Sequence, residues 1–362
     1  MPELKTIIIA AGGTGGHLYP GIALARELAR RNFTPVFIVR ENDPAQDILA
    51  REQFAFRAIP VRGMPRKISF RFAGFIYFLF KGLFATARVL GELKPEAVVG
   101  MGGYISFPAV FIARLMGMRT LIHEQNYIPG LSNRILSHFC GTVAVSFEQS
   151  ASFFSRRKTI VTGNPVRADL FNAQPREAYA FFGLDPAKCT VLVFGGSLGA
   201  SALNTAIVST LPELADAKDK LQFIHLAGKR DADTVAAAYK AAGIRAAVRA
   251  YLHEIGLAYS AADLVICRAG ATTVTELSFL KKKAVLVPYP HATADHQHFN
   301  ASLLVQSGQA VEIRENALTP ALLASRIVAA AETFATHTAP PPPPPALPQS
   351  RLADAVSASL AF

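Results

Sequence analysis

The sequence has few cysteines and few charged residues for a chain of 362 residues. Its three cysteines, Cys140, Cys189 and Cys267, are far apart and form neither a CxxC pair nor a cysteine–histidine spacing that binds zinc. We therefore expect reduced cysteines in a cytoplasmic protein. Charged residues make up only 17% and hydrophobic residues 51% of the chain. This excludes an intrinsically disordered chain, because so much apolar surface offsets the entropy lost on folding.

A secretion signal and a long uncharged run are also missing. The residues before the first glycine loop lack the basic, apolar and small-residue regions of a signal peptide, so we expect no secretion by that route. The longest uncharged run of the most apolar stretch is Phe72–Phe80, with nine residues. A membrane-spanning helix needs about 20 such residues, so we expect no transmembrane helix.

Familiar nucleotide motifs are missing as well. The loops Gly12–His17 and Gly195–Gly199 do not fit the P-loop, since no Lys-Ser/Thr follows them, or the GxGxxG dinucleotide pattern. We assign no paired carboxylates to a divalent cation, and we expect no metal and no other cofactor. If these loops bind a diphosphate, its charge would be neutralised by helix dipoles, backbone amides, hydroxyls and an arginine.

The positive charge is concentrated in the first half of the chain. The net charge is +11; residues 1–162 contain 20 Lys and Arg against 10 Asp and Glu, whereas residues 163–362 contain 17 against 16. A basic half indicates an anionic partner, which could be nucleic acid, an acidic membrane or a phosphorylated substrate. No nucleic-acid-binding motif is recognisable, and the basic residues adjoin phenylalanines in an apolar run, so we expect no nucleic-acid partner.

The chain contains two similar openings about half its length apart. The first is a β-branched run, Thr6–Ala10, followed by the glycine loop Gly12–Gly16 and a helical pattern from Pro20. The same order recurs from Thr190–Phe194 through a second glycine loop to a helix that contains Leu203.

Strands and helices alternate after each opening. Further strands are predicted at Pro35–Val39, Ala97–Val99, Thr120–Ile122, Thr142–Val145, Phe223–Leu226, Leu264–Ile266 and Ala284–Val287. Such alternation predicts right-handed βαβ units and parallel sheets with helices on both faces. The expected fold class is α/β, with two Rossmann-like, doubly wound domains that bind ligands beyond the carboxyl ends of their strands.

Two breaks divide the chain. Gly163-Asn164-Pro165 resists continuation of a helix or a strand, so we place a domain boundary there, between residues 1–162 and residues 163–345. The six prolines Pro340–Pro345 should form a polyproline II spacer. The helical spacing that follows predicts a terminal helix, within residues 346–362, which crosses back to the first domain.

The stretch from Arg66 to Leu90 combines many aromatic residues with basic ones. It is either a buried helix of the first domain or an interfacial element, with its apolar face in the lipid boundary and its cations at the headgroups. The density of Phe and Tyr favours the membrane. The candidate membrane contacts are Phe72, Phe75, Phe78, Leu79, Lys81 and Phe84.

Polar residues gather in loops that follow predicted strands. They occur in Gly102–Pro108, His123–Asn126 and His291–Asn300, on the side where such folds bind ligands. A glycine turn before a helix suits a diphosphate, although glycines also occur simply because a tight turn requires them. Four histidines at strand ends leave a metal site open as an alternative, but no ligand pair at i, i+4 accompanies them. They are His17, His123, His291 and His296.

Seven ordered segments between Thr6 and about Ala301 closely resemble the MurG family of bacterial glycosyltransferases. They are AGGTGGHLYP, GMGGYISFP, HEQNYIPGLSNR, TGNPVR, FGGSLGASALN, CRAGATTVTEL and PYPHATADHQHFNA. The resemblance implies a GT-B fold, with a deep cleft between the two domains. It implies an inverting transfer of N-acetylglucosamine from UDP-GlcNAc to the 4-hydroxyl of MurNAc in undecaprenyl-pyrophosphoryl-MurNAc-pentapeptide. This reaction converts lipid I to lipid II in peptidoglycan synthesis, by a peripheral protein at the cytoplasmic face of the inner membrane.

The family's functional positions can be carried over to matching residues of this chain. His17 is the candidate base, because histidine changes charge near neutral pH. The donor-binding candidates are Thr14, Gly15, Gly16, Asn126, Arg167, Ser197, Leu252, Ala271, Thr272, Thr273, Glu276, His296 and Gln297. The candidates in loops facing the acceptor and its diphosphate are Gly13, Gly103, Tyr104 and Ser106.

The resemblance also implies what each donor residue contacts. Asn126 matches the position that contacts the donor sugar, and Glu276 the carboxylate that binds the ribose hydroxyls. Leu252 matches the backbone beside uracil, while His296 and Gln297 match side chains that read the sugar hydroxyls. Arg167 and Ser197 match positions at the hinge and the diphosphate, and Ala271–Thr273 match a helix N-terminus that faces the phosphates.

Two competing functions stay open. A UDP-GlcNAc 2-epimerase would bind the same donor between two Rossmann-like domains but would not need an apolar face for lipid. A non-catalytic membrane-surface binding module would bind substrate without turnover. The expected partners are UDP-GlcNAc, the polyprenyl-pyrophosphoryl-MurNAc-pentapeptide lipid and an anionic membrane surface.

Overall fold

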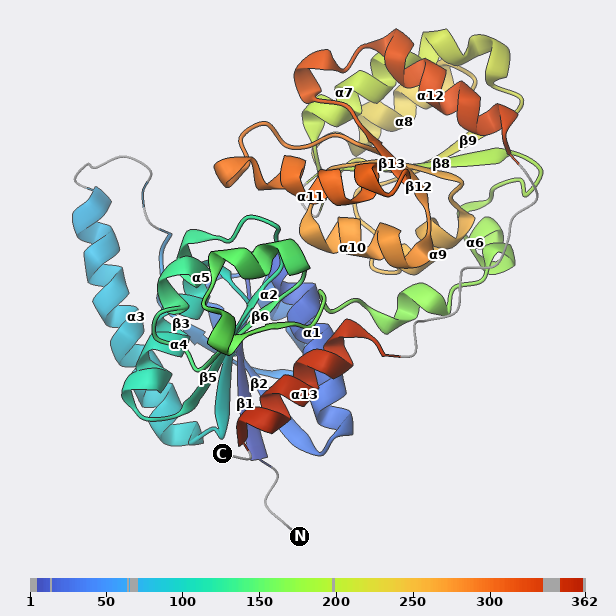
Figure 1. The fold of residues 1–362 in the computed structure, drawn as a ribbon. Helices are drawn as coiled ribbons and strands as arrows, with labels where there is room; N and C mark the ends of the chain where they lie inside the picture. Colours follow the sequence, from blue (N-terminus) through green and yellow to red (C-terminus); the bar gives the residue numbers. More distant parts are fainter. Residues whose placement is uncertain are drawn as a thin grey trace. The chain divides into compact units, whose positions relative to one another are not determined.

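The computed structural model describes residues 5–13, 15–63, 65, 71–196, 199–334 and 346–360 (Figure 1). The chain forms two compact units. One consists of Met1–Arg167 together with Pro345–Phe362, and the other of Ala168–Pro344. Thr14, Ser197 and the proline run Pro340–Pro345 lie outside the described residues.

The first unit is built on a sheet of seven parallel strands in the order β3-β2-β1-β4-β5-β6-β7. Its strands are β1 (Lys5–Ala10), β2 (Phe33–Arg40), β3 (Ala55–Ile59), β4 (Ala97–Gly100), β5 (Arg119–Glu124), β6 (Thr142–Val145) and β7 (Thr159–Val161). Its helices are α1 (Gly15–Arg30), α2 (Ala45–Arg51), α3 (Arg71–Leu93), α4 (Gly103–Leu115), α5 (Leu131–Leu136) and α13 (Pro348–Leu360).

Strand β1 is a continuous apolar run because both of its faces are buried. Ile7 and Ile9 belong to a core formed with α1, α2 and α13, whereas Ile8 belongs to a second core formed with α4 and α5. Successive side chains of a strand point to opposite faces, and helices cover both faces here. All three isoleucines are therefore fully buried.

The terminal helix α13 packs on the first unit. Leu352, Ala353 and Val356 are fully buried and share a core with residues of α1. At its start, Gln349 Oε1 accepts a hydrogen bond from the Val166 amide. The last helix of the chain is therefore part of the hydrophobic core that its first helix forms.

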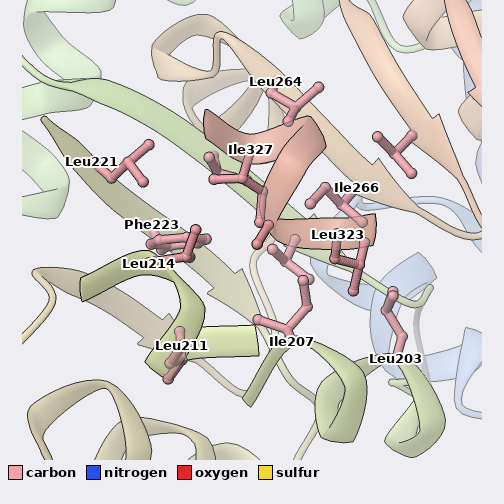
Figure 2. Close-up of a cluster of buried hydrophobic side chains, with 14 of the residues drawn as sticks. Leu203, Ile207, Leu211, Leu214, Leu221, Phe223, Leu264, Ile266, Leu323 and Ile327 are labelled. Atoms are coloured by element: carbon pink, nitrogen blue, oxygen red, sulfur yellow. The ribbon is translucent and has the colours of Figure 1, made fainter. Parts of the chain in front are cut away.

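The second unit repeats the pattern with six parallel strands in the order β10-β9-β8-β11-β12-β13. The strands are β8 (Cys189–Phe194), β9 (Leu221–Leu226), β10 (Ala246–Arg249), β11 (Leu264–Cys267), β12 (Lys283–Leu286) and β13 (Ala310–Glu312). The helices are α6 (Pro175–Phe182), α7 (Ser201–Thr210), α8 (Ala232–Ala241), α9 (Ile255–Ala261), α10 (Ala271–Leu280), α11 (His296–Gln306) and α12 (Pro320–Glu332). Figure 2 shows its core, where side chains of α7 and α12 meet those of β9 and β11.

The nine strands predicted from the sequence are present, but four further strands were not predicted. These are β3 and β7, at the two edges of the first sheet, and β10 and β13, at the two edges of the second. The first helix also begins at Gly15 and not at Pro20. The glycine loop is therefore shorter than expected, and His17 lies in the first turn of α1.

The expectation that the apolar stretch is too short to cross a membrane was wrong on length. The helix α3 has 23 residues and continues through Lys81 and Arg88, whereas the uncharged run alone has nine. By length and composition, its segment Phe72–Leu93 would be able to span a bilayer.

Candidate active site

Three strand ends bring together the polar residues of the first unit. The strands β1, β4 and β5 are neighbours in the sheet, so the loops after them share one edge. His17 follows β1, Gly102 follows β4 and Gln125 follows β5. His17 Nδ1 lies 3.0 Å from Gln125 Oε1. Within the described residues, His17 Nε2 makes no hydrogen bond, and the ring is half-buried.

The backbone at Gly102 passes directly beside the His17 ring. Its φ is 93°, in the region that favours glycine. A Cβ placed there would lie 3.0 Å from both Cε1 and Nδ1 of His17. A side chain at Gly102 would therefore displace the imidazole.

Gln125 and His123 continue the contacts behind His17. Gln125 Nε2 lies 2.8 Å from the Met101 carbonyl oxygen and 3.0 Å from His123 Nδ1, and His123 Nε2 lies 3.0 Å from the Gly163 carbonyl oxygen. Full burial lowers the pKa of His123 to about 4. His123 is therefore neutral at physiological pH. Of these residues, only His17 was expected to take part in the chemistry.

The carboxylate of Glu124 organises the loop that carries Asn126. It accepts hydrogen bonds from the Asn126 amide at 2.8 Å, the Gly130 amide at 3.0 Å and Asn133 Nδ2 at 2.9 Å. A buried carboxylate requires such donors. The candidate sugar-binding residue Asn126 is thus held in place by the carboxylate of the residue two positions before it.

A carboxylate from another loop binds the first glycine loop. Asp43, in the loop between β2 and α2, accepts a hydrogen bond from the Gly13 amide at 2.9 Å with Oδ2 and one from the Ala45 amide at 3.0 Å with Oδ1. The Gly13 amide was expected to face the acceptor's diphosphate, but in the structure it donates to a carboxylate. The sequence analysis did not identify Asp43, because no motif connects it with the glycine loop 30 residues earlier.

The other acceptor candidates occupy different environments. Tyr104 is exposed beside Gly103, at the start of α4. Ser106 is fully buried, and its Oγ lies 2.7 Å from the Gly102 carbonyl oxygen and 3.2 Å from that of Ala10. A buried hydroxyl with these contacts supports the backbone of the loop that was expected to face the acceptor. The guanidinium of Arg167 lies 4.6 Å from the centre of the Tyr19 ring.

The second unit places Glu276 on α10, which follows β11. Glu276 is buried, and its Oε2 accepts a hydrogen bond of 2.9 Å from the Tyr259 hydroxyl. The helix begins after Gly270, with Ala271 buried and Thr272 and Thr273 half-buried in its first turn. That turn has no acidic residue, so the helix dipole there favours an anion.

His296 and Gln297 are the first two residues of α11, directly after the loop that follows β12. Gln297 Oε1 accepts a hydrogen bond from the Tyr289 amide at 2.9 Å, and His296 Nδ1 lies 2.9 Å from the Thr293 carbonyl oxygen. Two consecutive residues there, Ala294 and Asp295, have φ of 52° and 51°. Backbone in this region costs free energy outside glycine and is maintained by its surroundings.

Arg314 and Arg268 hold that loop, although the sequence analysis did not identify either. Arg314 Nη1 binds the Asp295 carboxylate at 2.9 and 3.1 Å. The buried Arg268 donates to the carbonyl oxygens of Val287 and Pro288 and to the Glu315 carboxylate. Both arginines follow strands, so their position at the site was recognisable only once the strand order was known.

The remaining candidates of the second unit lie in its other strand-end loops. Leu252 is buried between β10 and α9. In the glycine loop after β8, Gly199 has a φ of 77°, and a Cβ there would lie 2.8 Å from the Ala227 carbonyl oxygen. Backbone of the β9 loop therefore approaches this turn closely, which glycine alone allows.

The sequence analysis assigned no pair of carboxylates to a divalent cation, but it overlooked the spacing Asp231-Ala232-Asp233. Asp231 accepts hydrogen bonds from Ser201, Arg230 and Asn204, and these donors lower its pKa. Among the described residues, no group of three or more His, Cys, Asp or Glu is arranged to hold a metal ion.

The candidate membrane contacts lie on two sides of α3. Tyr77, Phe80 and Phe84 are 62%, 66% and 77% exposed and recur at helical spacing on one face. Phe72 and Lys81 are exposed as well, whereas Phe75, Phe78 and Leu79 are half-buried. Tyr77 and Phe80 were missing from the candidates, because helical phase could not be assigned within so dense an aromatic run.

The sequence matches two family descriptions. Residues 7–145 match the glycosyltransferase family 28 N-terminal domain, and residues 190–339 the family 28 C-terminal domain. The UDP-N-acetylglucosamine–N-acetylmuramyl-(pentapeptide) pyrophosphoryl-undecaprenol N-acetylglucosamine transferase of Syntrophus aciditrophicus is 41% identical over 323 residues, covering 89% of this chain and 88% of that protein. The protein of the same name from Geobacter sp. (strain M21) is 38% identical and covers 98% of this chain and 95% of that protein.

Solved structures are similar over nearly the whole chain. The MurG structure of Acinetobacter baumannii has a TM-score of 0.69 and 28% identity, and covers 98% of this chain and 99% of that chain. The UDP-GlcNAc 2-epimerase of Methanocaldococcus jannaschii has a TM-score of 0.65 and 14% identity, covering 98% of this chain and 100% of that chain. At 14% identity the likeness concerns the fold alone.

Proposed function

The chain belongs to glycosyltransferase family 28, and we infer that it is an N-acetylglucosaminyltransferase of peptidoglycan synthesis. It transfers N-acetylglucosamine from UDP-GlcNAc to N-acetylmuramyl-(pentapeptide) pyrophosphoryl-undecaprenol, which converts lipid I to lipid II. Relatives that are about 40% identical over 89% of the chain support this transfer. The alternative function, a UDP-GlcNAc 2-epimerase, is supported only by the similarity of this chain's fold to that of an epimerase.

The observation that carries the mechanism is the position of His17. Its imidazole lies at the edge where β1, β4 and β5 end, with Nδ1 bound to Gln125 and Nε2 without a hydrogen bond among the described residues. A base must reach the acceptor's 4-hydroxyl in order to accept its proton. We propose that His17 accepts this proton, and the contact of its Nδ1 with Gln125 supports the proposal because it leaves Nε2 for the substrate.

The reaction is proposed to invert the configuration at the sugar. The acceptor oxygen forms a bond to C1 of the α-linked donor while the bond from C1 to the UDP oxygen breaks. The hydroxyl proton moves to His17, and the electron pair of the broken bond leaves with UDP. This displacement produces a β-1,4 linkage, and it requires the acceptor to be held in line with the leaving group.

The donor's nucleotide is proposed to bind the second unit. Glu276, with one carboxylate oxygen held by Tyr259, would accept hydrogen bonds from the ribose hydroxyls. The first turn of α10, at Ala271–Thr273, would hold the diphosphate by its amides and hydroxyls. Arg167 and Ser197 would add charge and a hydroxyl, and we propose that no metal is needed.

We propose that the exposed face of α3 binds the membrane at its cytoplasmic side, with the protein remaining peripheral. Gly82, Thr86 and Leu90 on the opposite face are buried against the unit. A Cβ at Gly82 would lie 2.7 Å from Val61 Cγ1. Because one face packs on protein, α3 is better suited to lie in the interface than to be surrounded by lipid. The first half's net positive charge favours anionic headgroups.

A transfer assay tests the proposed function. Labelled N-acetylglucosamine from UDP-GlcNAc should appear on a short-chain lipid I analogue, with UDP released in equal amount and with a chelator present. Donor bound or epimerised without transfer would rule out the acceptor assignment, and loss of transfer on adding chelator would rule out the metal-free mechanism.

The variant His17→Ala tests the base. We expect turnover to fall by about 10²-fold or more while donor affinity changes little, because only proton transfer is lost. The control is His138→Ala, which removes an exposed histidine of the same unit and should retain wild-type turnover. Unchanged turnover of His17→Ala would remove this residue from the mechanism.

A further inference from the structure

We propose that Gln125 and His123 are positioning residues that hold the His17 imidazole in the tautomer with its hydrogen on Nδ1. That tautomer leaves the Nε2 lone pair available to accept the proton of the acceptor hydroxyl. The proposal rests on the assignment of His17 as the base, and it adds two residues that act through His17 without touching substrate.

The argument starts from a backbone carbonyl. The Gly163 oxygen accepts hydrogen bonds and cannot donate one, and it lies 3.0 Å from His123 Nε2. His123 must therefore have its hydrogen on Nε2. Because burial keeps His123 neutral, its Nδ1 has no hydrogen and acts as an acceptor.

The side-chain amide of Gln125 is then fixed in one orientation. Its nitrogen lies 2.8 Å from the Met101 carbonyl oxygen and 3.0 Å from His123 Nδ1. Both of these atoms are acceptors, so the two amide hydrogens point at them. A flipped amide would place its oxygen against the carbonyl oxygen of Met101, which is repulsive.

The orientation of Gln125 in turn determines the tautomer of His17. Gln125 Oε1 is an acceptor, and it lies 3.0 Å from His17 Nδ1. The hydrogen of this bond must therefore belong to Nδ1, because an amide oxygen has no hydrogen to donate. A neutral His17 consequently has its lone pair on Nε2.

This arrangement also suits the protonated state. When Nε2 takes the hydroxyl proton, Nδ1 keeps its hydrogen and its bond to Gln125, so the ring does not need to turn during the reaction. The proton remains on His17, because an amide does not accept it at neutral pH. The carboxylate of neighbouring Glu124 does not compete for the ring, since it binds the Asn126 and Gly130 amides and Asn133.

The tautomer is directly measurable by NMR of ring-15N-labelled histidine in the full-length protein. We expect His17 to show Nδ1 as the protonated nitrogen and Nε2 as the unprotonated one at neutral pH, with signals assigned by their loss in His17→Gln. In Gln125→Met the Nδ1 acceptor is gone, and the population should shift toward hydrogen on Nε2. A wild-type His17 with its hydrogen on Nε2 would overturn the proposal without any variant.

Steady-state kinetics gives the functional readout. We expect Gln125→Met to lower kcat by about 10-fold or more, with the donor KM changed less than about twofold, because the wrong tautomer cannot accept the proton. His123→Gln keeps a hydrogen-bond donor for the Gly163 oxygen, so its kcat should fall less than that of Gln125→Met. Unchanged kcat in Gln125→Met would contradict the proposal.

Matched controls separate positioning from the general cost of removing a buried polar group. Gln222 of β9 is also fully buried, and its Nε2 donates to the Asp185 carbonyl oxygen and to Thr190 Oγ1. His225, also in β9, is buried and neutral like His123. Gln222→Met and His225→Gln should therefore keep kcat, and an equal loss of kcat in them would show that the effect is not specific.

The outcomes distinguish this proposal from the function on which it rests. If His17→Ala retains turnover, the base assignment fails, whatever tautomer NMR reports. If His17→Ala is inactive but Gln125→Met is fully active, the base assignment stands and the positioning role fails.

Discussion

At the residue scale, two buried histidines have the same electrostatics and different neighbours. Burial lowers the pKa of both His123 and His225 to about 4, because a charged imidazole loses its hydration there. His123 connects Gln125 to a backbone carbonyl, whereas His225 lies between Asn204 Oδ1 at 3.0 Å and the Tyr239 hydroxyl at 3.2 Å. Neutrality is thus a consequence of burial, and the role of each histidine depends on its hydrogen-bond partners.

The lowered pKa of His225 predicts a pH-dependent stability of the second unit. Between the unfolded pKa near 6.5 and the folded value near 4, the unfolded chain binds the extra proton. The free energy of unfolding therefore falls as pH falls through this window. From pH 7 to pH 5 the loss should be about 2 kcal/mol for this histidine.

Urea unfolding of wild type and His225→Gln at pH 7 and pH 5 measures that contribution. The variant lacks the titrating group, so its stability should fall by about 2 kcal/mol less than that of wild type. All other titrating groups are common to both proteins. Equal pH dependence would mean that His225 is not the group responsible.

At the element scale, α3 combines a packed face and an open one. Figure 1 shows it at the side of the first unit, and Tyr77, Phe80 and Phe84 on its open face are all more than 60% exposed. Contiguous exposed aromatic side chains are uncommon on soluble proteins and mark interaction surfaces. Its packed face, with Thr86 and Leu90 fully buried, fixes which side chains can meet a membrane.

The double variant Phe80→Ser, Phe84→Ser tests the membrane contact of α3. Each phenylalanine transferred from water to lipid contributes about 1.5–3 kcal/mol, so binding to anionic vesicles should weaken at least about 10-fold. Vesicle co-sedimentation measures this, while turnover of a soluble short-chain acceptor should be unchanged. Phe181→Ser, which removes an exposed phenylalanine of α6, is the control. Equal vesicle binding by the double variant and the control would contradict the assignment.

At the scale of the whole molecule, the chain uses one topology twice. The six strands β3-β2-β1-β4-β5-β6 and the six strands β10-β9-β8-β11-β12-β13 follow the same sequential order. Each sheet has its own hydrophobic cores. The first unit is discontinuous in sequence, because α13 supplies part of its core after the second unit has ended.

Separate cores predict separate destabilisation. Leu352 of α13 is fully buried in the first unit and Leu323 of α12 in the second. Leu352→Ala should cost the first unit about 2–5 kcal/mol through lost transfer energy and a cavity, and Leu323→Ala should cost the second unit a similar amount. Hydrogen exchange, read separately for β1 and β8, should show loss of protection only in the unit that contains the substitution. Loss in both units from either variant would mean that they unfold together.

The central strands could be predicted from the sequence, whereas the edge strands could not. A central strand of a parallel sheet is covered on both faces, so it appears as a continuous apolar run such as Thr6–Ala10. Edge strands are partly exposed, and β3, with the sequence AFRAI, and β13, with the sequence AVE, have no such run. Their pairing is determined by the neighbouring strand and not by their own composition.

The sequence by itself determined the two glycine-loop openings, the aromatic composition of α3 and the segments that place the chain in its family, because these depend on residues close together in the chain. Only the tertiary structure decided the partners of the site residues. Gln125 meets His17 across 108 positions, and Asp43 meets Gly13 across 30. Such contacts arise because parallel strands bring their carboxyl ends to one edge, and no local pattern encodes which of the loops there will exchange hydrogen bonds.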